Sequence, residues 1–420
     1  MPPPLARTLD NVTHSLAGLL LAESAIRLRA RREHAEPSST FRSIALVSSV
    51  IAANLPDADL LYTGSGGDRL RYMLQHRGYT HTVVMAGLGA LLLWGAAALI
   101  WRWHARESFA KADRRWLLGL LLASTLSHLV LDWTNSYGVH PFWPADDRWH
   151  YGDAVFIIEP WLWVVSVPAL VAASKSRFVR ILLSLVLLAG VALSWRVSLV
   201  TSGAAAALTT GAILFVIIAR LLSPDARAVA AVGGWVGVTL VMATGMTVAR
   251  ANALRSTREA DLGAVVLDVV VSPLPANAVC ASVITIERVG TTYRVATARA
   301  SAAPTITDAA RCGARADTRS MLASSTRRST PAVHWDGEWT APAAELATLA
   351  RESCPALAAL RFIRVPIWRR AGDSTILLGD VRYGGGSGNG FTDVQVPRRS
   401  TTCPNAVPPW TPPRADLLDD

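Results

Sequence analysis

The run WLLGLLLASTLSHLVLDWTNSYG, from Trp116 to Gly138, decides the class of fold and also where a function is to be sought. It opens with an uncharged apolar stretch, Trp116–Ser127, of the kind that crosses lipid. His128 and Asp132 follow, four residues apart, and so they project from one face of a helix. Ionisable side chains at the end of a membrane span are costly unless they are paired or ligated, and they mark a functional site by default.

Comparable apolar runs fill the chain up to about Ala249 and predict an all-α polytopic membrane domain over residues 1–250. Several runs reach the roughly 20 residues that cross a hydrocarbon core of about 30 Å. We therefore expect about eight transmembrane helices. The eight runs are His14–Leu28, Ser43–Leu55, Thr80–Trp101, Trp116–Ser127, Ala154–Ala173, Ile181–Trp195, Gly203–Ala219 and Ala228–Ala249.

The composition of the whole chain agrees with a membrane protein. Hydrophobic residues make up 51% and charged residues only 17%, against about 25% charged residues in soluble proteins. The mean hydropathy is +0.31. A purely soluble chain and a largely disordered chain are both excluded, because the apolar surface available for burial is ample.

The Lys and Arg residues of alternate loops divide unequally, which predicts the orientation. One set of loops carries 14 of them and the other set carries 6. The richer set should be cytoplasmic, which places the N-terminus, the loops 63–79 and 134–153, and the chain after Arg250 outside. Much of the net charge of +10 is then an orientation signal, and no nucleic-acid partner is expected.

After Arg250 the pattern changes to short alternating runs divided by Pro and Gly, namely Ala264–Val271, Ala281–Val289 and Thr291–Ala298. They predict a β-rich extracytoplasmic domain over residues 255–420, of sandwich-like form, with a disordered tail from about residue 408.

All four cysteines lie in this second domain, at Cys280, Cys312, Cys354 and Cys403. Confinement to one segment is what an oxidising compartment permits, and it predicts up to two disulfides in any of three pairings. The alternative is a four-thiolate zinc site, which lacks the usual C-x-x-C spacing.

Compact groups of polar residues interrupt the apolar pattern, and on the predicted orientation all of them lie at the outer face. They are Asp10–His14, Asn54–Asp59, His76–His81, His128–Asp132 followed by Asn135, and Asp153 with Glu159. The turn at Gly78 can bring the rings of His76 and His81 to one point. Imidazole together with carboxylate suits zinc, manganese or iron, whereas an all-carboxylate set would favour magnesium or calcium.

Structural interpretations stand beside the functional ones. Asp57 could end a helix in a simple turn. His128 and Asp132 could form a hydrogen-bonded pair between helices, and Asp153 and Glu159 could be capping or interfacial residues.

The motifs DNVTH (10–14), PDAD (56–59), HRGYTH (76–81), HLVLDWTNSYG (128–138) and DAVFIIEP (153–160) resemble the membrane-bound metal-dependent hydrolases of bacterial inner membranes. Some members of that family are linked to the LexA-controlled damage response. The resemblance covers residues 10–165 and extends less sharply into the second domain. The order of ligand types is also similar to that of zinc-dependent phospholipase C and P1-type nucleases, although the second closely spaced His…HxxxE arrangement of those enzymes is missing here.

The resemblance implies a hydrolase that holds one or two divalent metal ions, most simply zinc, with manganese or iron as alternatives. Its metal ligands would be His14, Asp57, His76, His81, His128 and Asp132.

Catalytic roles would fall to Asp59, Asp153 and Glu159, as general base or bridging ligand, and to Arg77. Arg77 could hold a phosphate bidentately or could pair with a ligating carboxylate.

We expect hydrolysis of an ester or phosphoester, in a lipid or an exported substrate, at the outer face of the bacterial inner membrane, with the second domain periplasmic. A metal-binding membrane protein without catalysis, a transporter and a membrane-anchored binding module are the alternatives. Transporters place ionisable groups near the bilayer midplane, whereas these lie at helix ends. The sequence does not indicate an oligomeric state.

Overall fold

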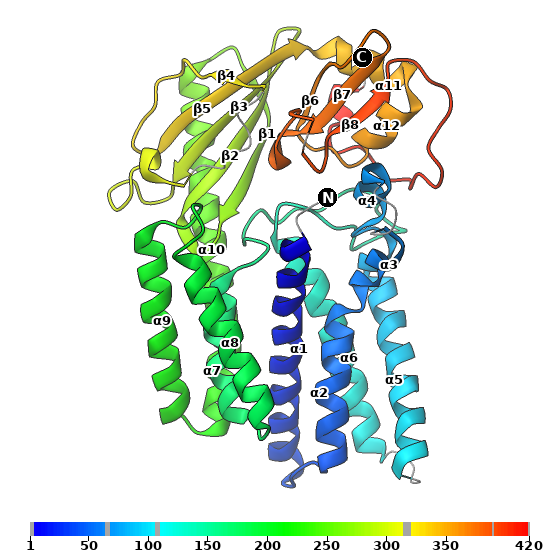
Figure 1. Cartoon of the computed structure of the whole chain (residues 1–420), viewed down its shortest axis with the longest axis vertical. Coiled ribbons are helices and arrows are strands. Elements are labelled where there is room, and N and C mark those ends of the chain that lie inside the picture. Colours follow the sequence, from blue (N-terminus) through cyan, green and yellow to red (C-terminus); the bar gives the residue numbers. More distant parts are fainter. Residues whose placement is uncertain (1–3, 64–67, 106–109, 314–320, 389, 419–420) are drawn as a thin grey trace.

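The computed structural model describes residues 4–63, 68–105, 110–313, 321–388 and 390–418. It consists of a bundle of long helices with a domain of strands and short helices standing on one end of the bundle (Figure 1). The N-terminus lies at the end of the bundle that carries this domain.

The long helices coincide with the apolar runs of the sequence. Short elements connect them at the end that faces the strands: η1 (Pro56–Asp59), α3 (Leu60–Thr63), α4 (Arg69–Gln75) and η2 (Tyr79–His81). The long helices are α1 (Pro4–Glu33), α2 (Ser39–Asn54), α5 (Val83–Ala105), α6 (Lys111–Thr134), α7 (Pro160–Ala173), α8 (Arg177–Ser194), α9 (Ser202–Leu221) and α10 (Pro224–Ala260).

Five of these helices are long and apolar enough to cross a membrane, namely α5, α6, α8, α9 and α10. The pair formed by α2 and the bent segment Pro56–Thr63 would make a sixth span. α1 does not belong to this set although it has 30 residues, because its mean hydropathy is low. α7 has only 14 residues. The expected eight spans are thus five or six by length and composition.

Local sequence explains where the helices begin and end. Ser38, Ser176, Thr201 and Ser223 precede α2, α8, α9 and α10, and each hydroxyl accepts a backbone N–H of the first turn. α2 ends at Asn54 because Pro56 cannot continue its hydrogen-bond ladder, and the chain bends by 53° there.

The set of loops that carries 14 Lys and Arg residues, counted with the adjoining helix ends, lies at the end of the bundle away from the strands (Figure 1). They join α1 to α2, α5 to α6, α7 to α8 and α9 to α10. The unequal division of charge found in the sequence therefore corresponds to the two ends of one bundle.

The second domain contains two antiparallel sheets. The five-stranded sheet has the order β1-β2-β3-β5-β4, and the three-stranded sheet has the order β6-β7-β8. Helices α11 (Ala343–Glu352) and α12 (Cys354–Leu360) lie between them in the chain. The strands are β1 (Val265–Leu274), β2 (Asn277–Val289), β3 (Thr292–Ser301), β4 (Ala323–Ser324), β5 (Val333–Pro342), β6 (Pro366–Arg370), β7 (Thr375–Asp380) and β8 (Val394–Pro397).

The five-stranded sheet buries both of its faces. One face packs on α10 through Met246, Ala249 and Ala253. The other face shares a core with the three-stranded sheet, α11 and α12. The expected sandwich-like form is therefore modified, because a membrane helix covers the outer face of one of the two sheets.

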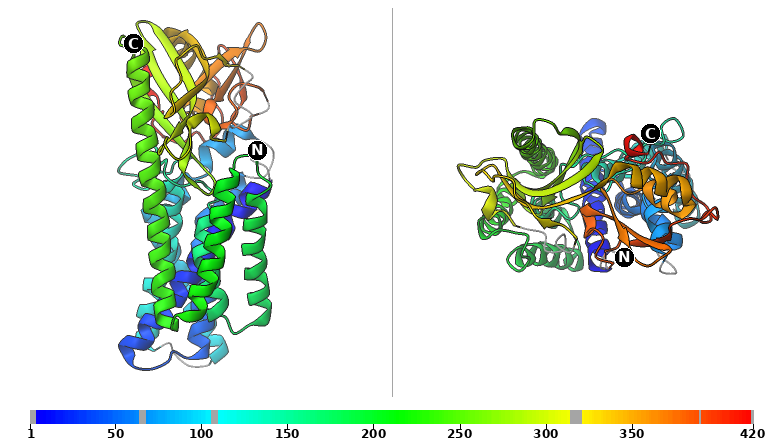
Figure 2. Two further views of the ribbon diagram at one scale, coloured as in Figure 1. Left: turned by 90° about the vertical axis from the view of Figure 1, so that its left-hand side faces the viewer. Right: turned by 90° about the horizontal axis from the view of Figure 1, so that it is seen from above.

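α10 joins the two parts of the molecule without a break. Figure 2 shows it running along the bundle and on beneath the sheet. Its 37 residues correspond to about 55 Å, well beyond the roughly 30 Å of a hydrocarbon core. Gly245 is needed where β2 crosses the helix, because a side chain there would overlap the carbonyl of Ala278.

The cysteines form two disulfides within this domain, as predicted, and the pairing is Cys280–Cys312 and Cys354–Cys403.

The expectation of a disordered tail from about residue 408 is wrong for the described residues up to 418. Trp410 is completely buried, and its indole N–H donates to the carbonyl of Leu74 at 2.9 Å. The proline-rich composition suggested disorder, but one large aromatic side chain anchors the segment on the bundle.

Candidate metal centre

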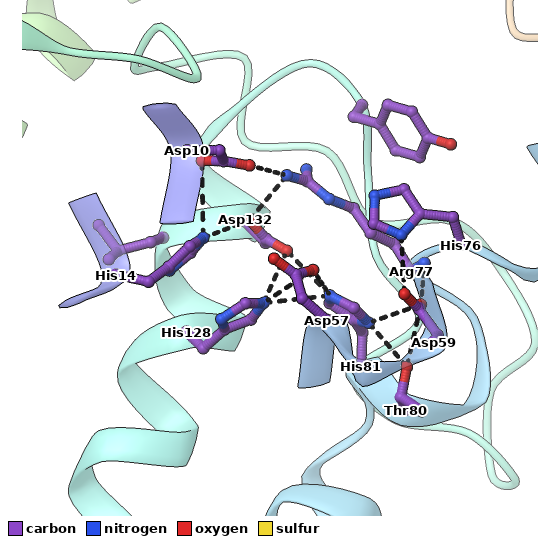
Figure 3. Close-up of polar contacts among 12 residues, drawn as sticks. Asp10, His14, Asp57, Asp59, His76, Arg77, Thr80, His81, His128 and Asp132 are labelled. Carbon is purple, nitrogen blue, oxygen red and sulfur yellow. Dashed lines mark hydrogen bonds and ion pairs between the residues drawn. The ribbon is translucent and has the colours of Figure 1, made fainter. Parts of the chain in front are cut away.

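The polar groups of the sequence converge on the end of the bundle that faces the second domain. Figure 3 shows them in one cluster, contributed by α1, η1, the turn before η2, η2 and α6. The members are Asp10, His14, Asp57, Asp59, His76, Arg77, His81, His128 and Asp132. Nearly all of these side chains are buried.

Four side chains in the middle of this cluster direct donor atoms at one point. The Nε2 atoms of His81 and His128 are 3.1 Å apart. Asp132 Oδ2 lies 3.1 Å from the first of these nitrogens and 3.3 Å from the second. Asp57 Oδ1 lies 3.3 Å and 3.6 Å from the same two atoms.

These separations fit a single cation. Zinc bonds to imidazole nitrogen and carboxylate oxygen are about 2.0–2.1 Å long, so the edges of a tetrahedral ligand set are about 3.3 Å. The five separations given above lie between 3.1 and 3.6 Å. Two histidines and two aspartates form a donor set of borderline softness, which suits zinc and its first-row neighbours.

The tautomer of His128 follows from its backbone contact. Its Nδ1 lies 2.7 Å from the carbonyl of Ala53, which can only accept, so Nδ1 carries the proton. In the neutral ring Nε2 then offers a lone pair, as a metal-binding histidine requires. An N–H on His81 Nε2, 3.1 Å away, would donate to this lone pair, whereas two facing lone pairs would repel each other. A cation between the two nitrogens removes that repulsion.

Asp59 organises the turn that carries the other histidines. Its Oδ1 lies 3.0 Å from His76 Nδ1. Its Oδ2 accepts from the backbone N–H of Arg77 at 3.0 Å and from the hydroxyl of Thr80 at 3.1 Å, and it lies 3.6 Å from His81 Nδ1. This carboxylate therefore orients His76 directly and His81 through the hydroxyl of Thr80, which lies 3.0 Å from His81 Nδ1.

Arg77 is almost fully buried and pairs with carboxylates. Its guanidinium lies 2.8 Å from Asp132 Oδ1 and 3.1 Å from Asp10 Oδ2, and it donates to Asn135 Oδ1 at 3.0 Å. Burial alone would lower the pKa of Arg77, but the nearby carboxylates outweigh it and raise the pKa above its usual value. Of the two roles considered for Arg77, the contacts correspond to pairing with the carboxylates.

A second group of donors shares Asp132 with the first. His14 Nε2 lies 3.4 Å from Asp132 Oδ1 and 3.5 Å from Asp10 Oδ1. Neither nitrogen of His14 has a hydrogen-bond partner among the described residues. The sequence analysis missed Asp10 as a ligand, although its spacing of four residues from His14 repeats the spacing of His128 and Asp132.

The cluster has an excess of negative charge. Asp10, Asp57, Asp59 and Asp132 face a single permanent cation, Arg77. Buried carboxylates must be compensated, because transferring an isolated charge from water costs many kcal/mol. A bound divalent ion would offset most of this excess negative charge.

Asp153 and Glu159 have other partners. Asp153 pairs with Arg364 at 3.0 Å and with Arg250 at 2.7 Å, and so it links the bundle to the second domain. Glu159 accepts the backbone N–H of Trp161 at the start of α7 and that of Ala276 in the β1–β2 turn. The contacts found within the described residues do not join either carboxylate to the cluster.

The family model of the YdjM inner membrane protein matches residues 9–244, which is more than half of the chain. The chain belongs to this family. The match begins just before Asp10 and ends within α10, so it includes every residue of the cluster and stops short of β1. This family membership, together with the apolar helices, makes the chain an inner membrane protein.

No curated protein and no solved structure matches the chain.

Proposed function

We propose that this chain is a metal-dependent hydrolase that acts on an ester or phosphoester at the outer face of the inner membrane. The observation that carries the proposal is the four-donor group of Asp57, His81, His128 and Asp132, whose atoms are spaced as the ligands of one cation. The Asp10, His14 and Asp132 group provides for a second ion.

A divalent ion held here would supply activation of water and polarisation of a carbonyl or phosphoryl oxygen. The residues of the chain would do the rest. Ala53 fixes the ring of His128, Asp59 orients His81, and Arg77 holds Asp132 and Asp10 in place. Asp57 is the most exposed of the four donors, at 9% of its side chain, and so it lies toward the substrate side.

His76 is the best candidate for the proton-transfer step. Its Nδ1 faces Asp59 at 3.0 Å, so the proton is held there and Nε2 remains to accept or give another. This arrangement repeats the carboxylate–imidazole pair that orients a general base in hydrolases. His76 would then act beside the four-donor group, although it also forms, with Asp57 and Asp59, a further set of donor atoms close enough to share an ion, as predicted for a ligand.

The proposed location of the cluster at the outer face of the membrane is supported by the distribution of Lys and Arg among the loops. The Arg-rich connections lie at the end of the bundle opposite the cluster, and such loops stay in the cytoplasm. Two disulfides in the second domain agree with an oxidising compartment. A cluster at this boundary would meet lipid head groups or exported substrates.

The test uses three variants of the full chain purified in detergent, with metal analysis and hydrolysis of bis-p-nitrophenyl phosphate and p-nitrophenyl acetate. His128→Ala should lose both bound metal and turnover. His76→Gln should keep the metal and lose activity by about 10²–10⁴-fold, the usual contribution of a general acid or base. His334→Ala, a partly exposed histidine of the second domain, is the matched control and should change neither.

Hydrolysis that survives in His128→Ala would overturn the assignment. Metal bound by the wild-type protein without turnover of any ester would instead favour a metal-binding protein, and metal flux across vesicles would favour a transporter.

A further inference from the structure

At the Arg-rich end of the bundle, far from the cluster, a groove runs between α1 and α6. Its volume is about 480 Å³, within the roughly 300–1,000 Å³ of ordinary ligand sites. Most of the groove is lined by apolar and small side chains, among them Leu21, Leu28, Leu120 and Ala123. Two arginines, Arg32 and Arg115, line its charged end.

The two arginines of the groove differ from their neighbours. Most arginines around this end of α1 have a carboxylate partner: Arg27 and Arg42 with Glu23, Arg29 with Glu33 and Asp113, and Arg31 with Asp225. Within the part of the chain that the structure describes, Arg32 and Arg115 make no ion pair with a carboxylate. Arg32 lies instead over the ring of Trp116 at 6.0 Å.

Trp116 fixes the mouth of the groove. Its indole N–H donates to Glu33 Oε1 at 3.0 Å, and this bond joins the second turn of α6 to the last turn of α1. A tryptophan at this level is typical of the boundary between head groups and acyl chains. The charged end therefore lies at the depth of lipid phosphates, and the apolar length lies at the depth of lipid tails.

We propose that this groove binds one anionic phospholipid. The phosphate would be held by Arg32 and Arg115, and an acyl chain would lie along Leu21, Leu28 and Leu120. Arg32 and Arg115, which have no carboxylate partner among the described residues, complement a head group with net negative charge. A zwitterionic head group would bind less well, because its own cationic group would lie close to the two arginines. The site is independent of the proposed hydrolase activity and does not require the metal cluster.

The test is native mass spectrometry of the full chain taken from nanodiscs of phosphatidylcholine with or without phosphatidylglycerol. The wild-type protein should retain one phosphatidylglycerol in preference to phosphatidylcholine. Arg32→Gln with Arg115→Gln should weaken retention roughly 30-fold, as expected for two arginines at an anionic head group. Arg114→Gln with Arg177→Gln, two exposed arginines at the same end, removes the same charge outside the groove and should have little effect.

A second variant tests the apolar part without changing charge. A side chain added at Gly119, which lines the groove, meets no atom within 4 Å, so Gly119→Leu should fill the channel without disturbing the fold. It should also reduce phosphatidylglycerol retention. Equal retention of the two lipids by the wild-type protein, or unchanged retention in both groove variants, would overturn the proposal.

Discussion

Glu159 is a buried carboxyl group at the junction of α7 and the second domain. Burial raises its pKa to about 8, although the backbone N–H groups of Trp161 and Ala276 oppose this. A carboxyl whose folded-state pKa is raised favours the folded state below its ordinary pKa, and this contribution disappears as the pH rises through the folded-state value. The junction should therefore weaken between about pH 4.5 and about pH 8.

We expect the melting temperature of the solubilised wild-type protein to fall across this pH range, because Glu159 must ionise in a buried position. Glu159→Gln cannot ionise, and its melting temperature should depend less on pH. Glu259→Gln, at an exposed carboxyl, should keep the wild-type slope. Equal slopes in all three proteins, measured by scanning fluorimetry, would contradict the assignment.

At the scale of residues, the sequence predicts those parts of the cluster in which the spacing of two residues along the chain determines how close their side chains are. His128 and Asp132 are neighbours on one helix face, and the turn between His76 and His81 is short. Contacts between residues that are far apart in the chain cannot be predicted from local spacing. Asp153 meets Arg364, which lies 211 residues later, so its ion pairs could not be distinguished from a place in the cluster.

Among the elements, the C-terminal segment around Trp410 has a direct effect on the cluster. Its indole packs on the ring of His140 at 3.8 Å and lies against Tyr79 at 4.9 Å. Together with the carbonyl of Gln75, the same indole crowds the space that a side chain at Gly78 would need. The segment around Trp410 thus packs against the turn that carries His76 and His81.

Trp410→Ala should lower the free energy of unfolding by about 3–5 kcal/mol, the usual cost of removing a buried aromatic side chain. It should also reduce metal retention, because the turn that carries His76 and His81 loses its support. Trp103→Ala, at a tryptophan with 68% of its surface exposed on α5, is the control. Thermal melting and metal analysis provide the two measurements. Normal metal content in a destabilised Trp410→Ala protein would limit the segment to a role in stability.

Elements with strong local patterns are predictable, and the exceptions have physical causes. The alternating runs correspond to β1, β2 and β3 to within a few residues at each end, apart from the start of β2. β8 has four residues and α12 has seven, which is too short for a readable period. α11 does have one, since Leu346, Ala347, Leu349 and Ala350 are buried at helical spacing, but its ten residues were not singled out. The tail looked disordered because proline and aspartate dominate its composition, while one buried tryptophan determines its position.

For the whole molecule, the orientation in the membrane is the main open prediction. Ile306 is 78% exposed in the second domain, and Glu36 is exposed in the connection between α1 and α2. All four native cysteines are in disulfides, so a single introduced cysteine can be labelled alone.

An impermeant maleimide added to intact spheroplasts should label Ile306→Cys, because the second domain is expected outside. Glu36→Cys should be labelled only after lysis. The unmodified protein should remain unlabelled in both conditions. Labelling of Glu36→Cys in intact spheroplasts would reverse the orientation and would move the cluster to the cytoplasmic side.

The division into a helical part and a β-rich part is readable from hydropathy alone. The number of spans is not readable in the same way, since α1 is long but has a low mean hydropathy and α7 has only 14 residues. The docking of the second domain depends on the long-range pairs of Arg364 and Arg382, which no local pattern reveals.

The continuity of α10 restricts how a molecule can reach the candidate metal ligands. α10 is one helix with no proline at the junction, and the sheet packs directly on it. The sheet is therefore held in a fixed position on the bundle and cannot rotate away as a hinged domain could. Entry to the cluster would then be from the side, along the surface of the bilayer. Molecules that already diffuse in the plane of the membrane would have the shortest path.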